Sequence, residues 1–165
     1  IVNDVSGFRF DPELARVIAH YGAGVILMHR RGDALTMQSR TDYQDLISGV
    51  KRELKESIDI AIAAGISYES IAIDPGIGFS KTWRQSLSLI RHLAEFRELG
   101  CPLLIGPSRK SFIGEVTGKA AGDRIYGTAA AVALSVYNGA DILRVHDVAE
   151  MADVIQVARA IAEAE

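Results

Sequence analysis

Several features that define other protein classes are scarce in this chain of 165 residues. The only cysteine is Cys101, which excludes an intrachain disulfide and a thiolate zinc cage, and fits a reducing compartment. No apolar run approaches the roughly 20 residues that span a bilayer. The 18 basic residues do not outnumber the 21 acidic ones, so no overall basic field attracts nucleic acid or anionic lipid. We therefore expect no nucleic-acid partner and no membrane.

The composition that remains, 48% hydrophobic and 24% charged, is typical of a globular domain. The first residues, IVNDV, lack the basic and apolar regions of a signal peptide and resemble a strand already under way. We expect a single domain over residues 1–165 that belongs to a longer protein whose N-terminal part is missing.

Short apolar runs alternate with longer amphipathic segments, which predicts five β-α units and a parallel sheet covered by helices. The pattern alone does not separate an open, doubly wound sheet from part of a barrel. The predicted strands are 1–5, 25–28, 71–73, 103–105 and 142–145. The predicted helices are 12–21, 43–64, 83–99, 123–137 and 148–164.

The ends of these strands carry an unusual set of polar side chains. Both parallel architectures place their sites beyond the carboxyl ends of the strands. Asn3 and Asp74 suit the edge of a flat nitrogen heterocycle, where a carboxylate accepts paired N–H donors. Lys110, Arg144 and His146 suit a phosphate. The pattern favours a heteroaromatic substrate with an anionic leaving group. The segments are 3–7, 28–32, 74–81, 106–112 and 144–148.

Each signal also has a purely structural interpretation. Met28 alone is most simply a packing residue, and Asp74 before Pro75 is a common turn pair. Gly76 and Gly78 without a third glycine more often form a tight turn than a dinucleotide site. The four histidines show no metal-ligand spacing. The functional interpretation is favoured because all these residues follow consecutive strands at the same end.

These segments resemble the ordered motifs of dihydropteroate synthases, in order and over essentially the whole chain. The resemblance implies a (β/α)8 TIM barrel, of which this α/β chain supplies strands four to eight, and one departure is Ser80, where Gly or Ala is common. The motifs are NDVSG (3–7), MH with RG (28–32), DPGIGF (74–79), SRKSF (108–112) and RVHDV (144–148).

The resemblance implies a transferase of folate biosynthesis and a sulfonamide target. It would condense 6-hydroxymethyl-7,8-dihydropterin pyrophosphate with 4-aminobenzoate to give 7,8-dihydropteroate and pyrophosphate. Mg²⁺ is implied as cofactor, with its ligand residue in the missing N-terminal part and no metal ligand in this chain. The implied catalytic residues are Lys110, Arg144 and His146. The implied pterin-binding residues are Asn3, Met28, Asp74, Phe79, Gly106 and Lys110; Phe79 and Ser111 bind aminobenzoate, and Arg144 and His146 bind pyrophosphate.

Two alternatives stay open. One is a methyltetrahydrofolate-dependent methyltransferase, which shares contacts of the Asn3 and Asp74 type but has no use for the Ser108–Ser111 segment or a pyrophosphate site. The other is a truncated, non-catalytic pterin-binding module. The family implies a homodimer for the complete protein. We expect a cytoplasmic location if the source is bacterial, and a mitochondrial or cytosolic one if the chain is part of a eukaryotic fusion.

Overall fold

The computed structural model describes residues 1–164 and contains five parallel strands in chain order. Strands β1, β2 and β3 form one ladder, β4 and β5 form another, and a single parallel bridge between Ile73 and Leu103 joins the two. The predicted parallel α/β arrangement is therefore present. The strands are β1 (Val2–Asp4), β2 (Val25–Met28), β3 (Ile71–Asp74), β4 (Leu104–Ile105) and β5 (Ile142–Leu143).

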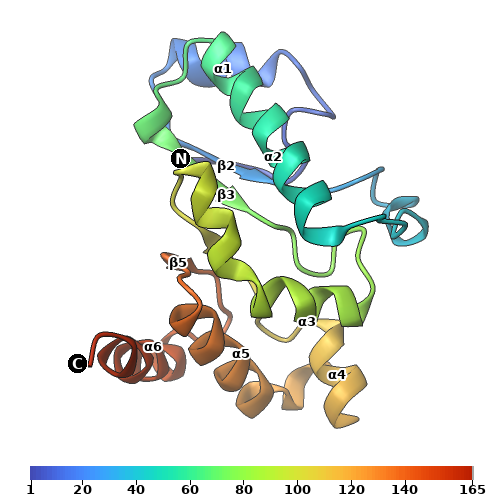
Figure 1. Cartoon of the computed structure of the whole chain (residues 1–165), viewed down its shortest axis with the longest axis vertical. Helices are drawn as coiled ribbons and strands as arrows, with labels where there is room; N and C mark the ends of the chain where they lie inside the picture. The colour runs from blue at the N-terminus through green and yellow to red at the C-terminus, as the bar shows by residue number, and fades with distance from the viewer. Residues whose placement is uncertain (165) are drawn as a thin grey trace.

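The helices follow the strands as the sequence predicts, with some differences in extent. Figure 1 shows α1 and α2 at one end of the molecule, α4 and α5 at the other, and the strands between them. The helices are α1 (Leu14–His20), α2 (Leu46–Ala63), α3 (Trp83–Arg91), α4 (Ser111–Thr117), α5 (Ile125–Tyr137) and α6 (Val148–Ala162). No helix of residues 1–164 has the length and apolar character that crossing a membrane requires.

Local capping sets where two helices begin. The carboxylate of Asp45 accepts the backbone N–H of Ser48 at 2.7 Å, so α2 starts at Leu46 rather than at residue 43. Thr82 and Gln85 form a reciprocal capping box at the start of α3. The predicted helix 83–99 instead divides into α3 and a 3-10 helix, Leu93–Leu99. The short helix α4 was not predicted.

The strand register decides which side chains share a face of the sheet. Asn3 pairs with Ile26, and two residues further along β2 Met28 pairs with Asp74. Because side chains alternate along a strand, Asn3, Met28 and Asp74 lie on one face. Leu103 pairs with Ile73, whose side chain lies on the opposite face. Leu104 and its partner in β5, Ile142, therefore lie on the same face as Asp74.

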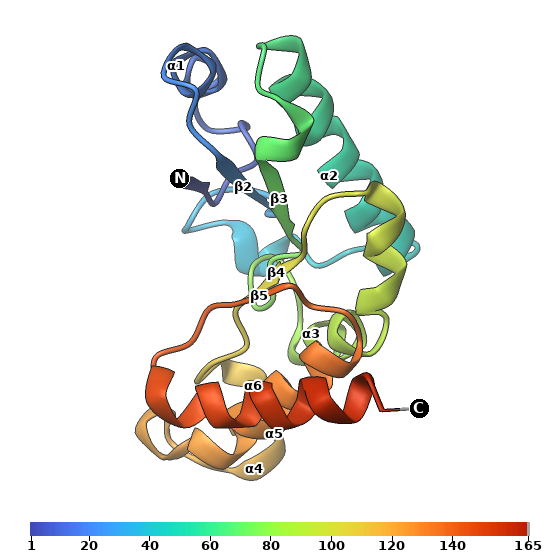
Figure 2. The ribbon, with the colours of Figure 1, turned by 90° about the vertical axis from the view of Figure 1, so that its left-hand side faces the viewer.

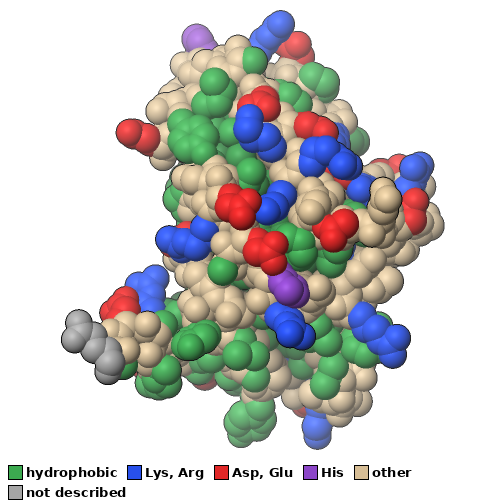
Figure 3. All heavy atoms as spheres, in the orientation of Figure 1, with side chains coloured by type: hydrophobic (Ala, Val, Ile, Leu, Met, Phe, Trp, Pro, Cys, Tyr) green, Lys and Arg blue, Asp and Glu red, His purple; other side chains and the backbone are tan. Residues whose placement is uncertain are grey.

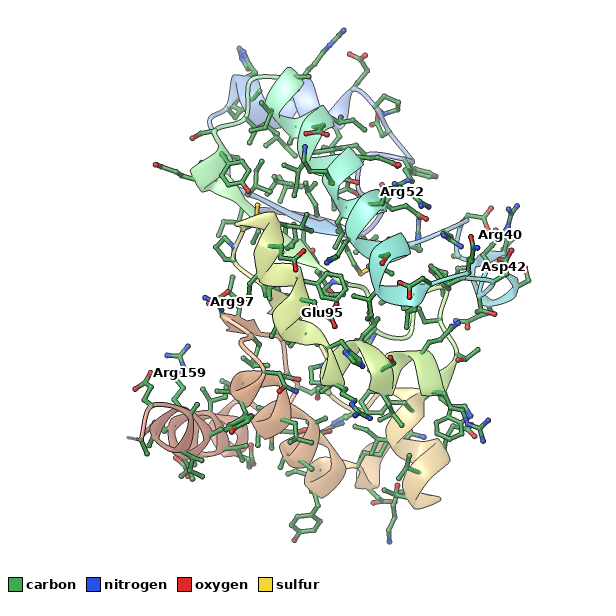
Figure 4. All side chains as sticks on the ribbon, in the orientation of Figure 1. Arg40, Asp42, Arg52, Glu95, Arg97 and Arg159 are labelled. Carbon is green, nitrogen blue, oxygen red and sulfur yellow. The ribbon has the colours of Figure 1, made fainter. Side chains whose placement is uncertain are left out.

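The opposite face of the sheet packs on the helices and forms the hydrophobic core. Leu27 of β2 and Leu54 of α2 are both fully buried there, and burial of a leucine stabilises a fold by about 1.5–3 kcal/mol. Figure 2 shows α2 alongside the strands. Arg97, labelled in Figure 4, donates to the carbonyl oxygen of Gly139 at 3.0 Å and so ties the 3-10 helix to the turn before β5.

Candidate functional site

Asp74, the last residue of β3, is the buried carboxylate of the candidate site. Its side chain accepts the backbone N–H of Gly76 at 2.7 Å, and the residue is only 9% exposed. Burial raises the pKa of Asp74 to about 6, against the opposing effect of the positive charges of Lys110, Lys81 and Arg144. The group is therefore a hydrogen-bond acceptor surrounded by cations.

Lys110, the residue before α4, reaches toward the β3 end. Its Nζ lies 4.2 Å from the centre of the Phe79 ring, a cation–π contact. A Cβ at Gly78 would lie 3.5 Å from the Lys110 Cδ, and the φ of Gly78 is +78°, a conformation that glycine adopts without steric cost. Burial lowers the pKa of Lys110, and the charge of Asp74 opposes this effect. Two strand ends thus supply opposite charges and an aromatic ring at one place.

A small pocket of about 80 Å³ joins Lys110 to the end of β5. Ser108 connects its two sides, because its hydroxyl lies 2.9 Å from His146 Nδ1 and accepts the backbone N–H of His146 at 3.2 Å. A serine hydroxyl has one donor and two acceptor sites, so it binds Nδ1 in either role while it accepts this N–H. The lining residues are Gly106, Ser108, Lys110, Arg144, Val145 and His146.

Two arginines fix the segment that carries Lys110. Arg109, in a left-handed conformation with φ of +58°, donates to Asp147 through Nε at 3.1 Å and Nη2 at 2.5 Å. These bonds hold the pKa of the Asp147 carboxyl below its usual range. Arg124 donates to the carbonyl oxygens of Arg109 and Lys110 at 2.9 and 3.2 Å. The β4 and β5 ends are therefore locked together around the pocket.

The remaining predicted residues lie around this centre. Asn3 and Arg144 line one hollow of about 520 Å³ on the open face of the sheet, together with Ile26 and Leu104. Met28 is the strand partner of Asp74 and only 3% exposed. Ser111 is exposed and begins α4, next to Lys110.

The structure thus brings together Asp74, Phe79 and Lys110, and joins Lys110 to the pair Arg144 and His146 through one pocket. Sequence reasoning gave no role to Ser108 or Asp147, although both stand in the quoted motifs. Within residues 1–164 no group of three or more His, Cys, Asp or Glu side chains is placed to hold a metal ion.

The sequence profile described as "Pterin binding enzyme" matches residues 1–146. The chain belongs to this family. Among curated relatives, the dihydropteroate synthase of Synechocystis is 47% identical over 162 residues, which are 98% of this chain and 56% of the relative. The Bacillus subtilis enzyme is 40% identical over 92% of this chain and 51% of its own length. The chain thus spans about half the length of these relatives.

Solved structures agree with this membership. The Yersinia pestis dihydropteroate synthase with a sulfonamide drug superposes with a TM-score of 0.94 at 33% identity, over 99% of this chain and 59% of that one. The Xanthomonas albilineans enzyme in complex with 7,8-dihydropteroate gives 0.89 at 38% identity, over 99% and 59%. The likeness confirms the predicted fold class, part of the α/β barrel of these enzymes.

Proposed function

We propose that the protein containing this chain is a dihydropteroate synthase and that these residues form its pterin and pyrophosphate sites. The observation that carries the proposal is the placement of buried Asp74 beside Lys110, with Arg144 and His146 in the adjoining pocket. Family membership makes a pterin the natural ligand. The substrates are 6-hydroxymethyl-7,8-dihydropterin pyrophosphate and 4-aminobenzoate.

Asp74 and Lys110 are suited to opposite needs of a pterin ring. The ring has an amino group and an adjacent ring N–H, and a carboxylate accepts both in a bidentate arrangement. Lys110 donates to the acceptor atoms of the same ring, while Asn3 and Met28 share the sheet face on which it would lie. Gly106 adds no side chain to the neighbouring pocket and leaves it room.

Arg144 and His146 stabilise the leaving group. During reaction the amine nitrogen of 4-aminobenzoate attacks the pterin methylene carbon, the carbon–oxygen bond breaks with its electron pair on pyrophosphate, and the amine loses a proton. Positive groups placed where negative charge develops supply a large part of catalysis. The hydroxyl of Ser108 holds the ring of His146 at Nδ1, which leaves Nε2 available to the departing oxygen.

The aromatic amine needs little help from the protein, because it is already unprotonated at neutral pH. Phe79 and Ser111 flank the proposed aminobenzoate position, one from the β3–α3 loop and the other from the start of α4. Within residues 1–164 no cluster of three or more His, Cys, Asp or Glu side chains is placed to hold a metal ion. We propose that Mg²⁺ enters with the oxygen atoms of the pyrophosphate and that its protein ligand lies outside these residues, and no step above depends on it.

A homodimer and a cytoplasmic location complete the proposal. An apolar groove of about 390 Å³ lies between α3, α4 and α5, and Figure 3 shows hydrophobic side chains gathered over this end of the molecule. Tyr126, Tyr137 and Val157 are exposed on α5 and α6. A second copy of the chain is the proposed occupant, and light scattering of the complete protein tests it. The cytoplasmic location rests on the bacterial relatives and the single buried thiol of Cys101.

The test is the synthesis itself, with the complete gene product that contains this chain. We expect dihydropteroate and pyrophosphate in equal amounts, and we expect Lys110→Met to abolish most of the rate. Lys119→Met, an exposed lysine just after α4, is the matched control and should leave the rate unchanged. Absence of dihydropteroate, or methyl transfer from methyltetrahydrofolate in its place, contradicts the proposal.

A further inference from the structure

A chain of buried polar groups lies behind the β3 end, and none of the substrate contacts proposed above involves it. His29 is fully buried and Lys81 is 3% exposed. Lys81 Nζ donates to His29 Nδ1 at 2.8 Å, and His29 Nε2 donates to the Glu53 carboxylate at 3.0 Å. A buried lysine is rare unless it has hydrogen-bond partners, and here it has them in a defined order.

His29, the histidine among these buried polar groups, is neutral. Burial lowers the pKa of His29 to about 4, and burial likewise lowers the pKa of Lys81 to about 7. Burial acts to raise the pKa of Glu53, but hydrogen bonds from His29 and Arg31 outweigh it and keep the carboxyl ionised. The neutral ring accepts at Nδ1 and donates at Nε2, so its two nitrogens relay the orientation of Glu53 to Lys81.

The loop after β3, which these buried polar groups hold, adopts backbone conformations that most residues avoid. Gly76 has φ of +73°, and a Cβ there would lie 2.0 Å from the carbonyl oxygen of His29. Ser80 has φ of +50° although it is not a glycine, and its hydroxyl accepts the backbone N–H of Arg31 at 3.0 Å. Tyr43 donates to the Ser80 carbonyl oxygen at 3.1 Å. Strained backbone of this kind persists only where its surroundings determine it.

Lys81 also acts directly on the residue that enters the site. Its Nζ donates to the carbonyl oxygen of Phe79 at 2.9 Å, and the Phe79 ring lies over Lys110. The polar chain therefore runs from α2 through the end of β2 to the backbone of an aromatic residue in contact with a proposed pterin ligand. A second path leads from Glu53 through Arg31 to Ser80, whose hydroxyl donates to the same carbonyl oxygen of Phe79 at 2.7 Å.

We propose that Lys81, oriented by His29 and Glu53, is a positioning residue that holds the Phe79 ring over Lys110 and so shapes the place of the aromatic amine substrate. This inference rests on the proposed dihydropteroate synthesis. A lysine that only stabilised the fold would affect both substrates equally or neither. A lysine that positions Phe79 affects the amine more than the pterin.

The kinetic test uses Lys81→Met in the complete gene product, which keeps the length of the side chain and removes its donors. We expect the KM for 4-aminobenzoate to rise about tenfold, the equivalent of one lost hydrogen bond to a charged group. The KM for the pterin pyrophosphate should change less than this, because Lys81 reaches the pterin site only through the effect of its charge on Asp74. Leu54→Ala, a buried residue next to Glu53 in α2, is the control that lowers stability without touching the polar chain.

Two further measurements test the role of Lys81 if the kinetics of Lys81→Met give no clear result. Glu53→Gln keeps the side-chain volume. We expect it to raise the KM for 4-aminobenzoate more than the KM for the pterin pyrophosphate, as Lys81→Met does, but by a smaller factor. Fluorine NMR with 4-fluorophenylalanine reports on Phe79 without any activity: its resonance, assigned with Phe79→Leu, should move or broaden in Lys81→Met and not in Leu54→Ala.

An unchanged Phe79 resonance, or equal changes in both KM values, overturns the inference. A wild-type protein that makes no dihydropteroate contradicts the proposed function instead, and the NMR comparison still decides the role of Lys81.

Discussion

Replacing Asp74 with asparagine should make the protein more stable and at the same time poorer at binding pterin. The amide keeps the shape of the side chain and an oxygen for the Gly76 N–H, but it removes a negative charge that is almost fully buried. The pKa of Asp74 rises from 3.8 to about 6 on folding because burial penalises the ionised form. At about 1.4 kcal/mol for each pH unit, the ionised group costs up to about 3 kcal/mol.

The pH dependence follows from the sign of this shift. Between about pH 4 and pH 6 the folded protein binds more protons at Asp74 than the unfolded chain does. The stability that this site contributes is therefore fully present below pH 4 and is lost as the pH rises through 6. The pKa of about 6 already includes the attraction of Lys110 and Lys81 to this carboxylate, so we expect a net gain of up to about 3 kcal/mol at pH 7.5 and almost none at pH 4.

Urea unfolding at pH 7.5, 6 and 4 measures this difference. Asp153→Asn, at an exposed position of α6, is the control and should leave the free energy of unfolding unchanged. Calorimetry on the same Asp74→Asn protein should show pterin affinity reduced by about 1–3 kcal/mol, the scale for a buried hydrogen-bond group left unpaired. A variant that is less stable than wild type at pH 7.5, or equally changed at all three pH values, refutes the reasoning.

Three other outcomes are expected. Arg144→Ala should lower kcat at least about tenfold, with a smaller change in the KM for aminobenzoate, because the charge it stabilises appears only as pyrophosphate leaves; steady-state kinetics with an unchanged kcat would count against it. Gly76→Ala should destabilise the fold by about 2 kcal/mol or more, because its Cβ collides with the carbonyl of His29 at positive φ; a urea midpoint equal to that of wild type argues otherwise. The 165-residue chain assayed alone should form no dihydropteroate, since β1 and β5 each pair on one side only within residues 1–164 and a barrel needs eight strands; turnover equal to that of a complete relative contradicts this.

Much of the fold could be predicted because the spacing of apolar residues in the sequence matches the side chains that are buried in the structure. Val50, Leu54 and Ile58 of α2 recur at spacings of four and are buried, whereas Ile62 near the end of the helix is exposed. The helix predicted over 83–99 changes type after Arg91, because the buried residues Leu89, Leu93 and Phe96 have spacings that both α and 3-10 turns satisfy. The sequence gives no clear helix signal over α4, because the glycines at 114 and 118 and the shortness of the segment weaken its periodicity.

The candidate site was predictable only where it lies along the strand ends. Asp74, Lys110 and Arg144 each lie at or after the end of an apolar strand, which predicts that they share one edge of the sheet. In the structure their charges are close enough to act on one another. Their individual roles toward substrate stay predictions. Glu53 carried no signal, because in the sequence it is one of several acidic positions on an amphipathic helix. Its burial arises from contacts with His29 and Arg31, which are 24 and 22 residues away along the chain.

The most direct test of the central claim is a crystal structure of the complete gene product with a pterin and pyrophosphate bound. We expect the pterin edge in bidentate contact with Asp74, with Lys110 on its acceptor atoms. We also expect the pyrophosphate within hydrogen-bond distance of both Arg144 and the Nε2 of His146. A pterin bound away from Asp74, or a pyrophosphate that touches neither Arg144 nor His146, contradicts the assignment of this site.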